Sequence, residues 1–565
     1  MILLNPKTET YAHLDEKSRQ IMLKTIDFFE NKGKQKVIDD FNDKVWYADF
    51  LEFLKENQIF ATLLTPAGYG DKDARWDTRR ICDFNEILGF YGLSYWYTWQ
   101  VSILGLGPIW MSNNEKVKQK TAQLLKDGAI FAFGLSEKQH GADIYASDMS
   151  LITIGEGKYM AEGGKYYIGN ANEAALVSVF GKNSETDEYV FFVVDSQHPN
   201  YDCVKNTVSS QNYVAEFALN SYPITENEIL HTGRDAWDAS LNTINVGKYN
   251  LGWGSIGICG HAFYEALNHA SHRKLFNSFV TDFPHIKKLF SDAYCRLTAM
   301  KLFALRASDY MRSASKDDRR YLLYNPMVKM KVTTQGEEVI NHLWDVIAAK
   351  GFEKDQYFSV AAIDIRALPK LEGTVHVNMA LIIKFMPNYF FNPGQFPEIP
   401  ERIDATNDDF LFQQGPTKGL GSIQFHDFNL AYDSVDLPNI SIFKQQIETF
   451  KEFMTKATPS GDQAKDVDFL LIVGELFTLV AYGQLIIENA KIKNLDEDIL
   501  DQIFDIIVRD FSKFALQLYS KANSTDTQME ICLRMIEKPF GDPSKFDRVW
   551  NKYIISKKDI YNMND

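Results

Sequence analysis

Glu372 is the side chain in this sequence that is best suited to moving a proton. It lies in the segment Leu371-Glu-Gly-Thr374, and a positioned carboxylate is a common general base. Glu-Gly-Thr by itself also occurs in ordinary loops, so the motif alone does not establish a site. Its chemistry depends on which other segments carry residues that could bind a ligand.

Three further segments carry such residues, and each also has a purely structural interpretation. The loop 135–143 (LSEKQHGAD) follows a strand-like segment, so its backbone N–H groups could donate to a phosphate or a ring carbonyl, or it could be a surface loop. The segment 164–170 (GKYYIGN) alternates like a strand, where Tyr167 could be an ordinary cross-strand aromatic. Arg273 ends a long helical pattern, a place where the helix dipole favours a cation in any case.

Hydrophobic periodicity predicts the elements that must position these residues. The period is helical at first, for example in Val45–Phe60, Ile81–Phe90 and Glu115–Leu125, changes to short strands near residue 128, and becomes helical again near 238. The strands are expected to form an antiparallel β domain from the segments 129–135, 150–154, 159–162, 165–168, 175–180 and 189–194, with Gly163 and Gly164 as punctuation. Later helical patterns cover 241–273, 283–313, 327–350 and 503–518.

The expected fold class is therefore α+β and mostly α. Four parts are predicted: an N-terminal helical domain (1–127), a middle β domain (128–237), a helical bundle domain (238–390) and a C-terminal helical extension (391–565). A segment rich in Pro and Gly, 392–400, opens the last part.

Charge and cysteine content narrow the class of protein. The 565 residues carry a net charge of −15, which argues against nucleic acid as the main partner. The five cysteines include no CxxC pair, which favours a reduced intracellular protein over a disulfide scaffold or a zinc site. The N-terminal segment has neither a long apolar stretch nor the acid-free composition of a transit peptide, so a cytoplasmic location is expected.

One segment raises the question of a membrane. Phe469–Ile487 is long and apolar enough to span a bilayer, with Glu475 as its one charge. The cost of placing an acid at the centre of a bilayer favours a buried helix of a soluble bundle. Docking of the extension on a membrane or on a partner remains open.

Taken together, the order and spacing of these segments resemble the acyl-CoA dehydrogenase family of flavoproteins. The loop 135–143 resembles the family's Thr-Glu-Pro-x-x-Gly-Ser-Asp loop, and 164–170 resembles its Gly-x-Lys-x-Trp-Ile-Thr-Asn strand. Arg273-Lys-Leu-Phe276 is similar to the family's Arg-x-x-Phe-Gly motif, and Gly351-Phe352 followed by Glu372-Gly-Thr is similar to its Gly-Gly-x-Gly-Tyr and Tyr-Glu-Gly-Thr run. The resemblance covers roughly 40 to 390, and the remainder resembles the extension of longer members.

The resemblance implies an FAD enzyme that oxidises an acyl-CoA or acyl-carrier thioester. Glu372 would remove the α-proton, the β-hydrogen would leave as hydride to flavin N5, and electrons would pass to an electron-transfer flavoprotein. A homodimer or dimer of dimers is implied, and no metal. The implied cofactor-binding residues are Phe133, Leu135, Ser136, Ala142, Tyr167, Gly169, Arg273, Phe276, Asp345, Ala349, Thr374 and His376. The implied substrate-binding residues are Ala142, Lys248 and Gly373.

Several positions depart from the family pattern. Ala348 and Ala349 stand where members have a Gly pair near the FAD diphosphate, and Gly169 stands where a Thr hydroxyl faces flavin N5. Ala142 replaces a Ser of the loop, and Tyr167 replaces a Trp. These changes keep a second hypothesis open, in which a family-like protein has lost the redox step and serves in binding or assembly.

Overall fold

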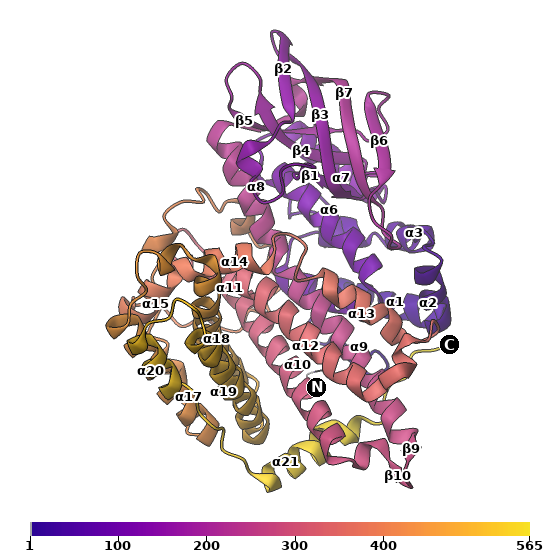
Figure 1. Ribbon diagram of the computed structural model, residues 1–565. Coiled ribbons are helices and arrows are strands. Elements are labelled where there is room, and N and C mark those ends of the chain that lie inside the picture. Colours follow the sequence, from indigo (N-terminus) through magenta and orange to yellow (C-terminus); the bar gives the residue numbers. More distant parts are fainter. Residues whose placement is uncertain (1–2) are drawn as a thin grey trace. The chain divides into compact units, whose positions relative to one another are not determined.

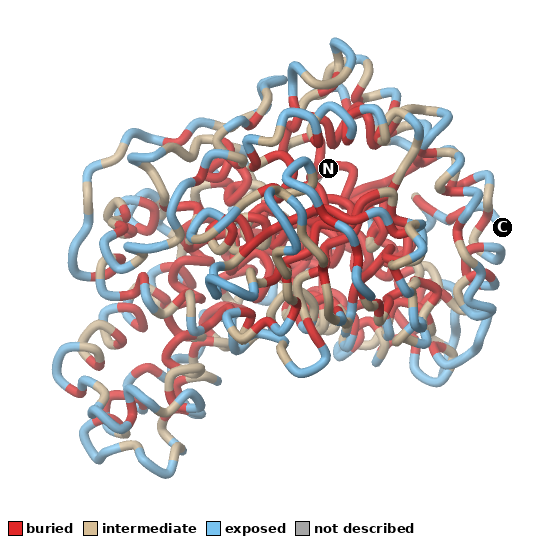
Figure 2. The backbone as a smooth tube through the Cα atoms, turned by 90° about the horizontal axis from the view of Figure 1, so that it is seen from above, coloured by how far each residue is buried: buried red, intermediate tan, exposed pale blue. Residues whose placement is uncertain are grey.

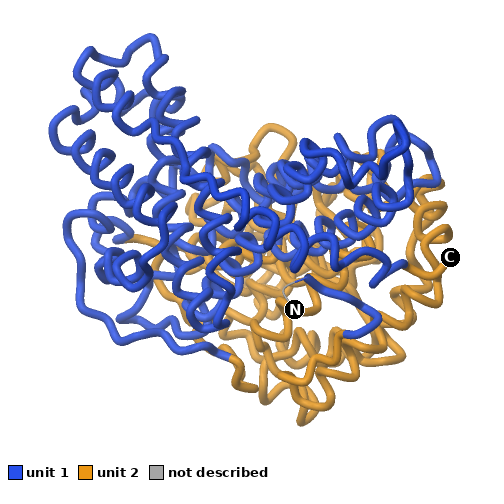
Figure 3. The backbone as a smooth tube through the Cα atoms, turned by 90° about the horizontal axis from the view of Figure 1, so that it is seen from below, with its two compact units in different colours: residues 1–8, 251–402, 419–562 blue, residues 9–250, 403–418, 563–565 orange. Residues whose placement is uncertain are grey.

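The computed structural model describes residues 3–565, which form two compact units (Figure 3). Unit 2 consists of residues 9–250, 403–418 and 563–565, and unit 1 of the described residues 3–8, 251–402 and 419–562. The fold is α+β and mostly α, as expected (Figure 1). The helical and β segments of the first 250 residues thus lie together in one unit, and the later helices in the other.

Unit 2 begins with helices. They are α1 (Glu16–Lys32), α2 (Lys34–Asn42), α3 (Ala48–Glu56), α4 (Ile59–Leu63), α5 (Thr78–Tyr91), α6 (Leu93–Met111) and α7 (Glu115–Lys126). The helices expected at 81–90 and 115–125 are confirmed as α5 and α7. The single helix expected over 45–60 is wrong, because Gln58 adopts a left-handed backbone (φ 54°) that ends α3 and starts α4.

The sheet of unit 2 has the order β6-β7-β3-β2-β4-β5-β8, with β1 beside β4. Its strands are β1 (Phe131–Gly134), β2 (Ser150–Gly155), β3 (Lys158–Gly169), β4 (Leu176–Asn183), β5 (Tyr189–Val194), β6 (Tyr201–Asn206), β7 (Val214–Thr225) and β8 (Ile229–Thr232). The expectation of an antiparallel domain is wrong in part, because β4 pairs parallel with both β1 and β2. The two strands expected at 159–162 and 165–168 are one strand, β3, since Gly163 lies at a bulge inside it.

Helix α6 packs closely against β1, the first strand of the sheet. A Cβ on Gly105 would lie 2.7 Å from the backbone of Ala132 in β1, so only glycine allows this approach. Ser178 of β4 donates to the Gly105 carbonyl at 2.7 Å, which ties α6 to the next strand as well. Helix α8 (Gly233–Lys248) packs on α6 and completes the helical side of unit 2.

Unit 1 is a helical bundle (Figure 1). Its first helices are α9 (Asn250–His272), α10 (Pro284–Arg312), α11 (Tyr321–Met327), α12 (Thr333–Ile347), α13 (Tyr357–Ala367), α14 (Val375–Ile382) and α15 (Met386–Phe391). A short hairpin, β9 (Lys274–Leu275) and β10 (Ser278–Phe279), separates α9 from α10. The helix expected at 283–313 is confirmed, whereas the pattern over 241–273 is two helices with Tyr249 between them. The pattern over 327–350 contains a π-helical turn, Val328–Val332, before α12.

The extension adds α16 (Asn429–Tyr432), α17 (Pro438–Lys456), α18 (Val467–Ile492), α19 (Glu497–Tyr519), α20 (Asp526–Arg534) and α21 (Pro543–Val549). Among the described residues, α18 is the one helix long and apolar enough to cross a membrane, and 78% of its apolar window is buried. It packs against α10 and α19 inside unit 1, which favours the core-helix interpretation (Figure 1). Figure 2 marks the buried stretches of the backbone in red.

Glu488 forms a buried polar centre where α18 meets α10. Arg306 donates to its carboxylate at 2.8 Å and the Tyr310 hydroxyl at 3.1 Å, and His426 Nε2 lies 3.3 Å away. Burial by itself would raise the pKa of Glu488, but the hydrogen bond from His426 and the charge of Arg306 outweigh burial and hold the pKa at about 2.

We predict that Glu488→Gln destabilises unit 1 at pH 7 by about 3 kcal/mol, because the buried Arg306 charge loses one of its two carboxylate partners and keeps only Asp309. The folded pKa is below the ordinary value of 4.5, so the stabilising effect of Glu488 is complete above pH 4.5 and is lost as the pH falls towards 2. The variant's melting temperature should therefore depend less on pH in this window. Thermal melts from pH 7 to 3 test this, with Glu448→Gln on the exposed side of α17 as control. Equal pH profiles for the wild type and Glu488→Gln would contradict it.

Ala348 ends α12 with φ 58° and ψ −141°, a conformation that strongly favours glycine. We predict that Ala348→Gly raises the melting temperature by about 2 °C, because relief of roughly 1–3 kcal/mol of backbone strain exceeds glycine's entropic cost. Ala349→Gly is the matched control, since Ala349 has no positive φ and should only lose stability. Differential scanning calorimetry measures both variants, and a lower melting temperature for Ala348→Gly would show that its backbone is not strained.

Candidate functional site

The loop after β1 is fastened to β3 by backbone and side-chain hydrogen bonds. Ser136 donates from its hydroxyl to the Tyr166 carbonyl at 2.7 Å, and the Tyr166 N–H donates to the Ser136 carbonyl at 2.9 Å. Leu135 and Ser136 are therefore held at a fixed place beside the end of β3, whereas Ala142 farther along the loop is exposed. A fixed loop of this kind can present backbone groups to a ligand without rearrangement.

Glu137 and Lys165 form the buried ion pair that closes this loop. Lys165 Nζ donates to Glu137 Oε1 at 2.7 Å and to the Leu135 carbonyl at 3.0 Å. Burial lowers the pKa of Lys165 to about 8 against the opposing effect of Glu137. The Glu137 carboxylate also accepts from Ser147 Oγ and the Asp148 N–H, so both of its oxygens have hydrogen-bond donors within the loop.

Tyr167 stands out of the sheet because β3 is irregular there. The pairing with β7 shifts register between Lys165 and Ile168, and Tyr167 has φ 64°. Its side chain is 63% exposed, which is unusual for a large aromatic residue in a strand. The ring is thus available to contact a planar ligand.

Tyr97 of α6 occupies the space where a side chain at position 169 would lie. A Cβ built on Gly169 would lie 2.6 Å from Tyr97 Cε1 and 2.8 Å from its hydroxyl oxygen. A hydroxyl group is therefore present where the sequence implied that one was lost. The sequence pattern does not single out Tyr97, because its neighbours Trp96 and Trp99 are core residues of the same helix.

Two other residues implied in unit 2 are buried. Phe133 is 8% exposed and stacks on Phe191 with ring centroids 6.0 Å apart, so its side chain belongs to the core. Lys248 is 8% exposed at the end of α8.

In unit 1, Glu372 lies on the loop between α13 and α14. It has φ 52° and is followed by Gly373 at φ 88°, so two left-handed residues in succession reverse the chain. The Glu372 Oε2 atom is shielded from solvent. A glutamate in this conformation costs free energy, and such strain is concentrated at functional sites.

The loop is joined to α14 by its first residues. Thr374 caps α14, its hydroxyl accepting from the Val377 N–H at 3.5 Å. Buried Asn378 donates from Nδ2 to the carbonyls of Gly373 (3.1 Å) and Thr374 (3.0 Å). His376 is exposed on the first turn of α14. The structure therefore brings Glu372, Gly373, Thr374 and His376 together on one short segment.

The remaining residues implied for unit 1 lie on other elements. Arg273 and Phe276 are exposed on the β9–β10 hairpin, where Phe276 is 91% exposed. Asp345 and Ala349 are exposed at the end of α12, near the 77% exposed Phe352. These exposed rings are the kind of apolar surface that binds another molecule.

Comparison with known proteins gives the same family for the sequence and for the fold. Residues 235–386 match the family model described as "Acyl-CoA dehydrogenase, C-terminal domain". The chain is 23% identical over 287 residues to 3-(aryl)acrylate reductase of Clostridium sporogenes, matching 50% of this chain and 75% of that protein. It is 21% identical over 381 residues to the caffeyl-CoA reductase-Etf complex subunit CarC of Acetobacterium woodii, matching 66% and 98%.

A solved structure resembles nearly the whole chain. It is an acyl-CoA dehydrogenase complexed with FAD from Bacillus anthracis, with a TM-score of 0.74 and 15% identity, covering 98% of this chain and 97% of that one. The extension beyond residue 390 is therefore part of a fold that occurs elsewhere. Residues 235–386 thus match the C-terminal domain of the acyl-CoA dehydrogenase family, and nearly the whole chain has the fold of an acyl-CoA dehydrogenase.

Proposed function

We propose that this protein is an FAD-dependent oxidoreductase that interconverts a saturated acyl thioester and its 2,3-enoyl form. The observation that carries the proposal is Glu372, a carboxylate held in a strained left-handed conformation inside the segment that matches the family's C-terminal domain. Acyl-CoA and acyl-carrier thioesters are both substrates of the proposed class.

The residues of this chain fit FAD. In unit 2, exposed Tyr167, the fastened backbone at Leu135–Ser136 and the Tyr97 hydroxyl supply an aromatic face and hydrogen-bonding groups. In unit 1, Ala348 and Ala349 are exposed, so their methyl groups do not fill a buried cradle, and Arg273 supplies a cation for a diphosphate. FAD would supply the hydride acceptor, or donor in the reverse direction.

Glu372 is assigned the proton-transfer step. Its carboxylate would take the proton from the α-carbon of the thioester, and its backbone N–H would donate to the thioester oxygen, where negative charge develops. Gly373, which follows it, leaves room for a substrate chain because it has no side chain. Thr374 and His376, at the start of α14, are proposed to contribute to holding the cofactor.

Partners and assembly belong to the same proposal. Exposed Phe276 and Phe352 support a homodimer or dimer of dimers, in which a second copy covers these rings. An electron-transfer flavoprotein is the proposed redox partner, in keeping with the Etf complex named for the Acetobacterium relative. The five free cysteines, four of them buried, support the proposed cytoplasmic location.

We predict that the purified protein binds FAD and shows a flavin absorbance band that bleaches under anaerobic conditions with a panel of saturated acyl-CoAs. A panel of enoyl-CoAs added to the dithionite-reduced protein tests the opposite direction, which the two reductase relatives represent. A protein that stays colourless after incubation with excess FAD would overturn the proposal in favour of a binding or assembly role.

We predict that Glu372→Gln retains FAD but reduces the rate of bleaching by at least 1000-fold, because an amide cannot accept the α-proton. Glu353→Gln, on the surface between α12 and α13, is the control and should bleach at the wild-type rate. Stopped-flow absorbance gives both rates. Bleaching of Glu372→Gln at the wild-type rate would show that the base lies elsewhere.

A further inference from the structure

A completely buried lysine lies against the loop that carries Glu372. Lys329 is 0% exposed and sits in the π-helical turn Val328–Val332 between α11 and α12. Burial of an ammonium costs free energy unless its N–H groups donate hydrogen bonds. The acceptors of those bonds therefore indicate which segment the lysine stabilises.

Its acceptors lie on both sides of Glu372. Lys329 Nζ donates to the Pro369 carbonyl at 2.6 Å and to the Gly373 carbonyl at 2.5 Å. Pro369 and Gly373 flank residues 370–372, so the Lys329 ammonium joins the two ends of the loop that carries Glu372. The Gly373 carbonyl also accepts from Asn378, which fixes the same point from α14.

We propose that Lys329 is the positioning residue for the base: it fixes the loop 369–373 so that Glu372 keeps its strained conformation and its carboxylate stays directed at the substrate. This inference rests on the proposed function, because it assigns Lys329 a role in the step that Glu372 performs. Lys329 acts through the two carbonyls and takes no part in the proton transfer. Displacement of a reacting group by about 1 Å costs roughly 100-fold in rate, which sets the expected size of the effect.

The π-helical turn is what places Lys329 here. A π turn leaves some carbonyls without the normal helical partner, and the next two residues supply hydroxyls to them. Thr333 Oγ1 donates to the Lys329 carbonyl at 2.5 Å, and Thr334 Oγ1 donates to the Met330 carbonyl at 3.0 Å. The turn is therefore built into the sequence rather than an irregularity at a helix end.

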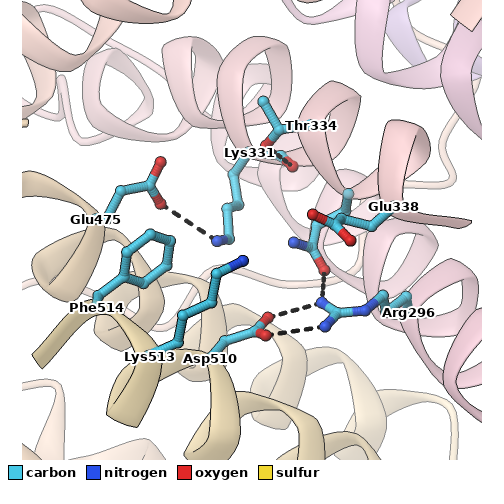
Figure 4. A pocket seen from close by; sticks show the side chains of 9 residues that line it. Arg296, Lys331, Thr334, Glu338, Glu475, Asp510, Lys513 and Phe514 are labelled. Atoms are coloured by element: carbon cyan, nitrogen blue, oxygen red, sulfur yellow. Dashed lines mark hydrogen bonds and ion pairs between the residues drawn. The ribbon is translucent and has the colours of Figure 1, made fainter. Parts of the chain in front are cut away.

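The same turn provides a matched control. Lys331, two residues on, is also buried, but it lines a pocket of about 90 Å³ between α12 and the extension (Figure 4). There it pairs with Glu475 of α18 at 3.3 Å, beside Phe514 and the bidentate Arg296–Asp510 pair. Lys331→Met thus removes a buried ammonium from the same turn without touching the Glu372 loop.

The experiment compares Lys329→Met with Lys331→Met in the FAD-loaded protein by stopped-flow reduction with a saturated acyl-CoA that bleaches the wild type. We expect Lys329→Met to lower the limiting rate about 100-fold while FAD content and the half-saturating acyl-CoA concentration change less than threefold. Lys331→Met should keep the wild-type rate. Butylammonium should restore at least a tenth of the rate to Lys329→Ala, and should not affect Lys331→Ala.

Hydrogen–deuterium exchange supplies a readout that does not depend on turnover. Amides of residues 370–378 should exchange at least 10-fold faster in Lys329→Met and at an unchanged rate in Lys331→Met. If Lys329→Met does not fold, Lys329→Gln, which retains an uncharged NH₂ donor, takes its place. The same loss of limiting rate and the same faster amide exchange are expected for it.

The outcomes separate the two proposals. Loss of bleaching in Glu372→Gln with a wild-type rate in Lys329→Met would overturn the role of Lys329 alone. Equal rate losses in Lys329→Met and Lys331→Met would also overturn it, because the effect would then be general loss of packing. Bleaching by Glu372→Gln at the wild-type rate would overturn the assignment of the base itself, whatever the exchange result.

Discussion

A glutamate at φ 52° needs support from its surroundings, and much of unit 1 around the loop 369–374 provides it. An unsupported residue would relax out of the left-handed region, since the cost is of the order of 1–3 kcal/mol. The Asn378 amide and the Lys329 ammonium donate to the Gly373 carbonyl of this loop, and the Thr374 hydroxyl accepts from the Val377 N–H at the start of α14. The strain is thus balanced by buried hydrogen bonds, and the position of the carboxylate becomes a property of the helices rather than of a flexible loop.

Unit 2 follows the same principle with other groups. The loop after β1 is held by the Glu137–Lys165 ion pair and by hydrogen bonds to β3, and the bulge in β3 turns Tyr167 outward. The structure offers a physical account of one departure from the family pattern, the glycine at position 169. Gly169 has no hydroxyl, but the hydroxyl of Tyr97 from α6 lies close to the position that a side chain at 169 would occupy.

The sequence was sufficient for the parts of the structure that depend on local pattern. Periodicity located α5, α7 and α10, and the spacing of four short motifs pointed to the family and to Glu372. It failed where long-range contacts decide. Parallel pairing of β4 with β1 and β2 depends on which strands meet, and Gly163 looks like a turn until β7 pairs along both sides of it. Tyr97 and Lys329 could not be found either, because a tyrosine among core aromatics and a lysine in a helical pattern carry no signal of what they face.

The C-terminal extension shows how charges complement an apolar helix. Helix α18 is apolar on nearly all sides, so hydrophobic contact alone would allow it to slide or rotate against α10. Glu475 and Glu488 interrupt the apolar surface once each, and each meets a buried cation, Lys331 or Arg306. A misplaced register would bury these carboxylates without partners, at a cost well above that of any lost methylene contact. Paired charges therefore define the register of the extension on the bundle, and one of the cations comes from the same π-helical turn that carries Lys329.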